Sequence, residues 1–197
     1  MRLSSAVTAV RRDSDRAMPL AGMAALVCYA THAAFHLVHG RWYDLVWACH
    51  LAAILVGVGL IARNSAINGI GVLLGLMGLP LWLADLATGG QFYPSSLLTH
   101  VVALALGLYG VARLGLPSGT WWKTIATLIA LIAICRLTTP AEANINVAFN
   151  IQRGWVDYFT SHVSYLAVTI GAASVYFFVV ERVVRRLLRL RSEAHAL

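Results

Sequence analysis

Six apolar segments, each close to the length that crosses a bilayer, constrain the fold of this chain more than any other feature of its sequence. A helix needs about 20 consecutive apolar residues to span the hydrocarbon core of a membrane. Segments of this kind fill most of the 197 residues, of which 59% are hydrophobic and only 12% are charged. Because a water-soluble core cannot bury so much apolar surface, we expect a single membrane domain. The six segments lie at about 18–38, 43–62, 66–88, 95–114, 121–138 and 158–180.

These segments are predicted to be helices rather than strands. A membrane barrel requires apolar and polar residues to alternate over about ten positions. The stretches LAAILVGVGLIA (51–62) and ALALGLYGVA (103–112) are instead apolar on every side. This pattern suits helices, whose backbone hydrogen bonds are satisfied within each segment. We therefore predict an all-α polytopic bundle of about six transmembrane helices over 18–182, with basic terminal segments at 1–17 and 183–197.

The basic residues predict the orientation of the bundle. With six spans, twelve of the 15 Lys and Arg residues fall on one side of the membrane. The positive-inside rule then places both termini in the cytoplasm of a multi-pass cell-membrane protein, which in a bacterium is an inner-membrane protein. The basic residues form no aromatic-interleaved stripe, so the expected partners are membrane lipids and not nucleic acid. The twelve are Arg2, Arg11, Arg12, Arg16, Arg63, Arg113, Lys123, Arg182, Arg185, Arg186, Arg189 and Arg191.

Three connections then lie outside, at about 39–42, 89–95 and 138–157. The last is the longest and contains the semi-apolar stretch INVAF beside Asn144, Asn150 and Trp155. A free linker is normally more polar. We expect this connection to be an interfacial or re-entrant segment over the outer end of the bundle.

Histidines at membrane depth are the most informative polar residues. His32, His36 and His39 are spaced i, i+4 and i+7, which places them on one face of a helix, and Cys28 extends the same face by one turn. Neutral imidazoles at i and i+4 can share a first-row metal ion. We therefore expect these histidines to be candidate metal ligands, with Asp85 or His50 completing the set.

Four further ionisable residues reach the same outer layer from other spans. With a helical rise of about 1.5 Å per residue, His50, Asp85, His100 and His162 all fall in the outer half of the bilayer. Each costs on the order of 2.5 to 3.5 kcal/mol at this depth, so such groups face the bundle interior and pair with one another. We therefore predict that these four residues form a catalytic site open to the outer face.

Three chemistries fit this layer. The first is a metal ion, and the second is a haem with axial ligands such as His50 and His100. The third is acyl chemistry, in which a histidine is the general base for a nearby nucleophile. Each histidine taken alone is as readily an interhelical hydrogen-bonding group. The hydroxyls near the layer, among which the sequence singles out none, are Thr31, Ser95, Ser96, Thr99 and Ser161.

Two stretches carry a resemblance to a known family. They are WACHLAAILVGVGLI (47–61) and FYPSSLLTHVVALALGLYGV (92–111), separated by a Gly-rich span that ends near Asp85. Over spans two to four the chain resembles the YwaF-type family of small helical membrane proteins. Related animal proteins of that wider group are lipid acyltransferases or hydrolases, so the resemblance implies lipid acyl chemistry, with His50 and His100 at the histidine positions. The chain departs from the family at Ala52, where the family pattern has cysteine.

These observations favour an integral membrane enzyme with a His and Asp site near the outer face, which hydrolyses or transfers acyl groups of a lipid or other amphiphile. One alternative is a membrane redox protein that binds haem or copper through the same histidines. Another is a small transporter or a membrane assembly subunit with a polar path through the bundle. The sequence indicates neither the substrate nor the oligomeric state.

Overall fold

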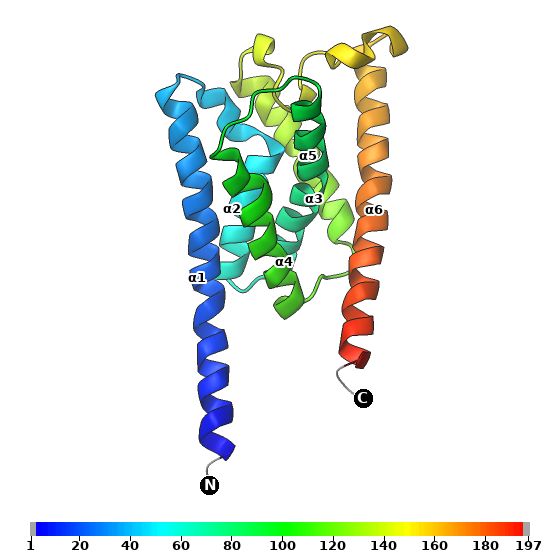
Figure 1. Ribbon diagram of the computed structural model, residues 1–197. Helices are drawn as coiled ribbons and strands as arrows, with labels where there is room; N and C mark the ends of the chain where they lie inside the picture. Colours follow the sequence, from blue (N-terminus) through cyan, green and yellow to red (C-terminus); the bar gives the residue numbers. More distant parts are fainter. Residues whose placement is uncertain (1–2, 195–197) are drawn as a thin grey trace.

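The computed structural model describes residues 3–194 and is an all-helical bundle, as the sequence predicts. No strand occurs within this range. The described start of the first helix and the described end of the last lie at the same end of the bundle (Figure 1). The helices are α1 (Leu3–Val38), α2 (Ala48–Ile61), α3 (Ser65–Ala87), α4 (Ala103–Leu114), α5 (Thr120–Thr138) and α6 (His162–Ala194).

Four of these helices are long and apolar enough to cross a membrane: residues Arg16–Val38 of α1, all of α3 and α5, and residues His162–Arg191 of α6. The second and fourth helices are shorter than expected. α2 has 14 residues and rises about 21 Å, which is less than the roughly 30 Å hydrocarbon core. The expected span from residue 43 begins instead as a 3-10 turn, η1 (Trp42–Val46), and the extended backbone of Trp47 redirects the chain into α2.

The fourth helix also begins irregularly. A π-helical turn, η2 (Leu98–Val102), runs directly into α4, which has 12 residues. Single π-helical turns are rare in proteins and are frequently found at functional sites. Together η2 and α4 cover most of the expected 95–114 span.

Glycines let α1, α3 and α4 approach the central helix α2 closely. A Cβ atom on Gly59 of α2 would lie 2.4 Å from the backbone nitrogen of Asn68 on α3, and one on Gly22 of α1 would lie 2.6 Å from the carbonyl oxygen of Gly57. A Cβ on Gly107 of α4 would press on Val56. Small residues at helix interfaces allow this packing in membranes, where no hydrophobic force drives helices together.

α6 is attached to the start of α5 by a buried carboxylate. Glu181 is 2% exposed and accepts hydrogen bonds from the backbone nitrogens of Gly119 at 2.9 Å and Trp121 at 2.7 Å. These N–H groups belong to the first turn of α5 and lack partners within the helix. Arg185 lies 3.6 Å from the same carboxylate.

The long connection between α5 and α6 lies against the start of α2. It forms three 3-10 turns, η3 (Ala141–Ala143), η4 (Ile145–Val147) and η5 (Arg153–Tyr158). Asn146 donates to the carbonyl oxygen of Val46 at 2.8 Å and accepts from the backbone nitrogen of Ala48 at 2.9 Å. This contact fixes the position at which α2 begins.

Candidate functional site

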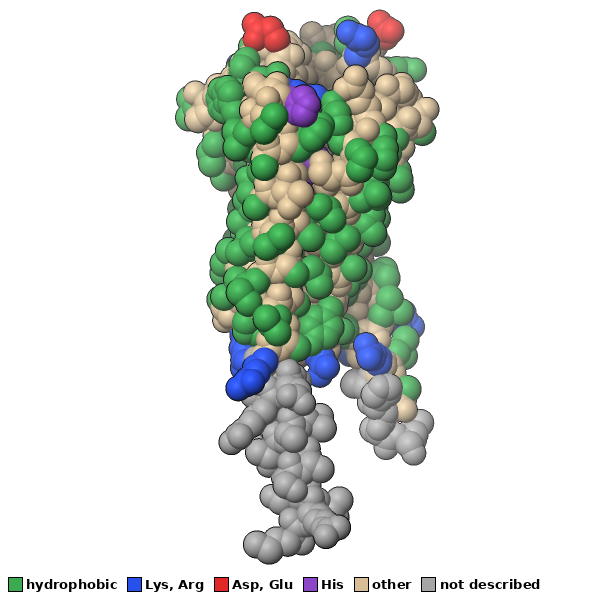
Figure 2. All heavy atoms as spheres, turned by 60° about the vertical axis from the view of Figure 1, so that its left-hand side comes forward, with side chains coloured by type: hydrophobic (Ala, Val, Ile, Leu, Met, Phe, Trp, Pro, Cys, Tyr) green, Lys and Arg blue, Asp and Glu red, His purple; other side chains and the backbone are tan. Residues whose placement is uncertain are grey.

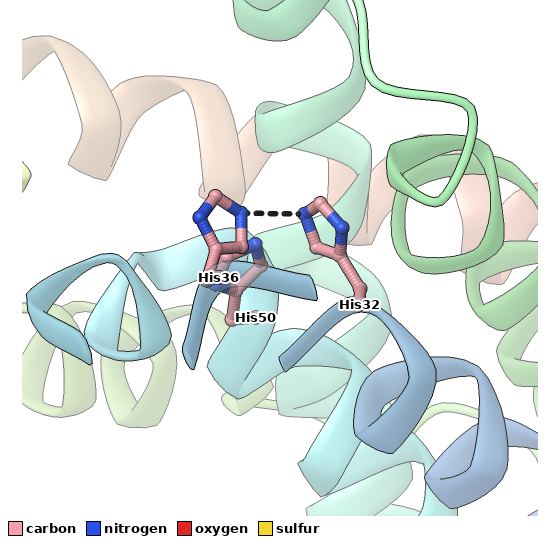
Figure 3. Close-up of side chains that lie close together, drawn as sticks. All are labelled: His32, His36 and His50. Atoms are coloured by element: carbon pink, nitrogen blue, oxygen red, sulfur yellow. Dashed lines mark hydrogen bonds between the residues drawn. The ribbon is translucent and has the colours of Figure 1, made fainter. Parts of the chain in front are cut away.

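Three buried imidazoles meet where α1 ends and α2 begins. His32 and His36 lie one turn apart on the inner face of α1, and His50 lies in the first turn of α2 (Figure 3). Their exposed fractions are 2%, 4% and 3%. One ring nitrogen from each lies within 4.8 Å of the others. We call these residues the histidine trio.

Two members of the trio belong to a continuous line of polar contacts. The Oγ atom of Ser95 lies 2.8 Å from Nδ1 of His32. The Nε2 atoms of His32 and His36 are 3.2 Å apart. Nδ1 of His36 lies 3.1 Å from Oδ2 of Asp44, which is an ion-pair distance outside hydrogen-bond geometry. We call this line, from Ser95 through both histidines to Asp44, the polar relay.

Asp44, at the end of the relay, is surrounded by side chains that can donate hydrogen bonds to it. It lies in η1, is 3% exposed and accepts a hydrogen bond from Nε1 of Trp47 at 3.1 Å. The guanidinium of Arg41 pairs with Oδ2 of Asp44 and also donates to the hydroxyl of Tyr93 at 2.7 Å. Burial disfavours the charge of this guanidinium, but Asp44 and Tyr93 outweigh burial and raise the pKa of Arg41. This arrangement suits an ionised carboxylate.

His50 contacts the relay without belonging to it. Its ring centroid lies 4.8 Å from that of His32 and 5.6 Å from that of His36. Its Nδ1 atom is buried and has no hydrogen-bond partner within residues 3–194. His50 therefore carries an unsatisfied ring nitrogen beside the two histidines of α1.

The other residues expected at the site lie apart from the trio. His100 is buried but stacks on Trp82, with centroids 4.7 Å apart, and its Nδ1 contacts the carbonyl oxygen of Ser96 at 2.9 Å. His162 contacts the carbonyl oxygen of Val147 at 2.8 Å, in the connection between α5 and α6. His39 and Asp85 are also outside the trio, and both are exposed.

Asp44 and Arg41 were not expected at the site. Residue 44 lies at the boundary of the expected second span. Charged residues are common at span boundaries, so depth in the membrane did not identify Asp44 as a site residue. A carboxylate eight residues after His36 has a structural meaning only once η1 folds the chain back against α1. Ser95 was among five candidate hydroxyls, and its contact with His32 separates it from the rest.

Comparisons with protein-family models, curated proteins and solved structures give no match for this chain. The resemblance to the YwaF-type family therefore stays a prediction from the residues quoted above. The chemistry of the site follows from its own geometry.

Two distributions of protons suit the observed contacts, because ring tautomers follow from hydrogen-bonding partners. If His32 carries its proton on Nε2, it donates to Nε2 of His36, and its Nδ1 accepts the proton of the Ser95 hydroxyl. If His32 and His36 both carry their protons on Nδ1, their Nε2 lone pairs face each other and repel unless a cation lies between them. The first arrangement is that of an activated nucleophile, and the second is that of a metal site.

Proposed function

We propose that this protein is an integral membrane hydrolase or acyltransferase that acts on an acyl ester of a lipid or another amphiphile. Ser95 is the nucleophile and His32 is its general base. The observation that carries this proposal is the unbroken polar relay, with contacts of 2.8, 3.2 and 3.1 Å from Ser95 to Asp44. Nucleophile, base and orienting groups within hydrogen-bond reach are the general signature of covalent acyl transfer.

The reaction would proceed in two steps. In the first, Nδ1 of His32 takes the proton of the Ser95 hydroxyl while Oγ attacks the acyl carbonyl carbon, and the leaving alcohol then takes that proton as the ester bond breaks. In the second, water or an acceptor alcohol gives a proton to His32 and attacks the acyl-serine, and Ser95 regains its proton. Each step conserves protons and needs no redox partner.

His36 and Asp44 are positioning residues in this mechanism. Asp44 holds the proton of His36 on Nδ1, which leaves Nε2 of His36 to accept from His32. His32 is thereby held with Nδ1 directed at Ser95. When His32 becomes doubly protonated, the negative charge of Asp44 stabilises it through His36, as the carboxylate does in serine hydrolase triads. Ser95 also precedes a helical turn, whose dipole favours negative charge at its start.

The membrane setting supports an amphiphilic substrate. We propose that all six apolar segments cross or enter the cell membrane, with both termini cytoplasmic and the site near the outer face. Figure 2 shows most of the visible Lys and Arg side chains at the end of the bundle near the termini, and Asp and Glu side chains with fewer basic ones at the opposite end. This distribution supports the proposed orientation. Ser95 would then lie close to the level at which lipid ester groups meet the apolar chains.

A fluorophosphonate probe tests the nucleophile without knowledge of the natural substrate. We expect detergent-purified protein to react at Ser95, located by peptide mass spectrometry. S95A should lose this label, and H32Q should react at least about 100-fold more slowly, as for loss of a general base. T31V removes a neighbouring hydroxyl that bonds only its own helix, at the carbonyl oxygen of Val27, and serves as the control. Undiminished labelling of S95A would contradict the proposal, and a Soret band in the absorption spectrum would favour a haem protein instead.

Labelling of single cysteines, introduced after Cys28, Cys49 and Cys135 are replaced by alanine, tests the orientation. Ser118 and Gly154 lie at opposite ends of the bundle, before α5 and in η5, and both are exposed. In intact cells an impermeant maleimide should modify G154C and spare S118C. The reverse pattern would invert the proposed topology and place the site on the cytoplasmic side.

A further inference from the structure

The spacing of the histidine trio matches the spacing of metal ligands. Two ligand nitrogens on a tetrahedral zinc ion, with bonds of 2.0–2.1 Å, are about 3.3 Å apart. The Nε2 atoms of His32 and His36 are 3.2 Å apart. The third imidazole, from His50, keeps its ligand atom within 4.8 Å of both (Figure 3). A movement of about 1.5 Å would bring it to a bonding position.

The unsatisfied nitrogen of His50 is an independent sign of a ligand. Nδ1 of this side chain is buried, and within residues 3–194 it has no hydrogen-bond partner. Burial of a polar atom without a partner is unfavourable, and a bound cation would remove that penalty. Nδ1 of His32 lies 2.8 Å from Oγ of Ser95, and Nδ1 of His36 lies 3.1 Å from Oδ2 of Asp44 as an ion-pair contact outside hydrogen-bond geometry. Metal-binding histidines commonly have such partners, which orient the ring and fix its tautomer.

We propose that His32, His36 and His50 bind one Zn²⁺ ion, and that this ion switches off Ser95; the second part rests on the proposed function. Neutral imidazoles suit zinc among the common divalent ions. Three histidines leave a fourth position for water. The site is therefore complete without a further side chain.

The inhibition follows from the protons of His32. Zinc takes the lone pairs on Nε2 of His32 and His36, so the single proton of His32 moves from Nε2 to Nδ1. In that state His32 donates to the Ser95 hydroxyl and cannot accept its proton. Zinc binding and activation of Ser95 therefore exclude each other, and removal of zinc restores the polar relay.

Zinc binding is measured first, apart from any reaction. The full chain, purified in detergent with its affinity tag removed, is titrated with ZnCl₂ by isothermal calorimetry, and bound zinc is counted by mass spectrometry after dialysis. We expect one ion per chain, lost in H50A. If H50A disturbs folding, H50Q keeps the size of the ring, and thermal melting in detergent identifies folded samples. H39A removes the exposed histidine that follows α1 and should keep the stoichiometry of one. Absence of zinc binding in folded wild-type protein would overturn the site.

Fluorophosphonate labelling with and without zinc then tests the coupling. We expect saturating zinc to slow the labelling of Ser95 at least tenfold and a chelator to restore it. In H50A the rate should be the same with and without zinc, whatever its value. Zinc that binds without slowing the label, or that accelerates it, would overturn the inhibitory role. Failure of Ser95 to react under any condition would defeat the proposed function, and the zinc stoichiometry would remain a separate test of the site.

Discussion

The substitution Asp44→Asn should separate the positioning role of the relay from its structural role. Oδ2 of Asp44 faces His36 and Arg41, and Oδ1 accepts from Trp47. An asparagine has one acceptor oxygen, so its NH₂ group faces either Trp47 alone or both His36 and Arg41. If the NH₂ group faces His36, Nδ1 must accept and the proton moves to Nε2, where it opposes the Nε2 proton of His32.

The size of the effect follows from the loss of the carboxylate charge that stabilises doubly protonated His32 and, where the NH₂ group faces His36, from the loss of tautomer control. A wrongly oriented or wrongly protonated base costs about 10² to 10⁴ in rate in serine hydrolases. One unsatisfied donor in a buried site costs about 1–3 kcal/mol of unfolding free energy. Asp44 is 3% exposed, so solvent cannot replace the missing acceptor. We therefore expect D44N to fold, to melt at a lower temperature and to react far more slowly.

The assay is the concentration dependence of fluorophosphonate labelling at Ser95. We expect the limiting rate at saturating probe to fall by about 10²- to 10⁴-fold, while the half-saturating concentration changes little, because the probe-binding surface is intact. D157N, in the exposed η5 turn, is the matched control. A D44N protein that is destabilised but reacts within threefold of the wild-type limiting rate would refute the positioning role.

Two further predictions concern the scaffold, and thermal unfolding in detergent checks both. G59A should lower the unfolding free energy by about 1–3 kcal/mol, since its Cβ would lie 2.4 Å from the backbone of Asn68. G171A, whose Cβ meets nothing within 4 Å, should not destabilise the protein. Equal losses of unfolding free energy in G59A and G171A would show that helix contacts do not cause the effect. E181Q should lower the unfolding free energy by a similar amount, about 1–3 kcal/mol, because a neutral amide offers Gly119 and Trp121 one acceptor instead of two. An unchanged melting temperature would show that the carboxylate does not hold α5.

The helical bundle could be predicted because its signal is local. Apolar runs such as those of α3 and α5 identify helices without any knowledge of their neighbours. The lengths of α2 and α4 could not be obtained in this way. Trp47 leaves the helical conformation, and Asn146 of the connection between α5 and α6 bonds to η1. Hydropathy is averaged over a window of residues, so it does not locate the break.

The site was predictable only where its residues share one helix. His32 and His36 meet because a spacing of four places them on one face, whereas His39, at the same angle, follows the last residue of α1 and is exposed. Depth counted along separate helices gives the height of a side chain but not the direction in which it points. His50 and His100 both lie toward the end of the bundle opposite the described helix termini, yet one joins the trio and the other stacks on Trp82. Rotation of a helix about its axis depends on contacts such as Gly22 on Gly57, which only the packed bundle specifies.

The same reasoning explains why Asp44 rather than Asp85 lies beside the histidines. Both carboxylates lie toward the same end of the bundle, but η1 directs Asp44 inward, where His36, Arg41 and Trp47 surround it. Asp85 is in the last turn of α3 and exposed. A buried carboxylate is tolerated only with such partners. Arg41 is therefore part of what allows a negative charge to hold the tautomer of His36.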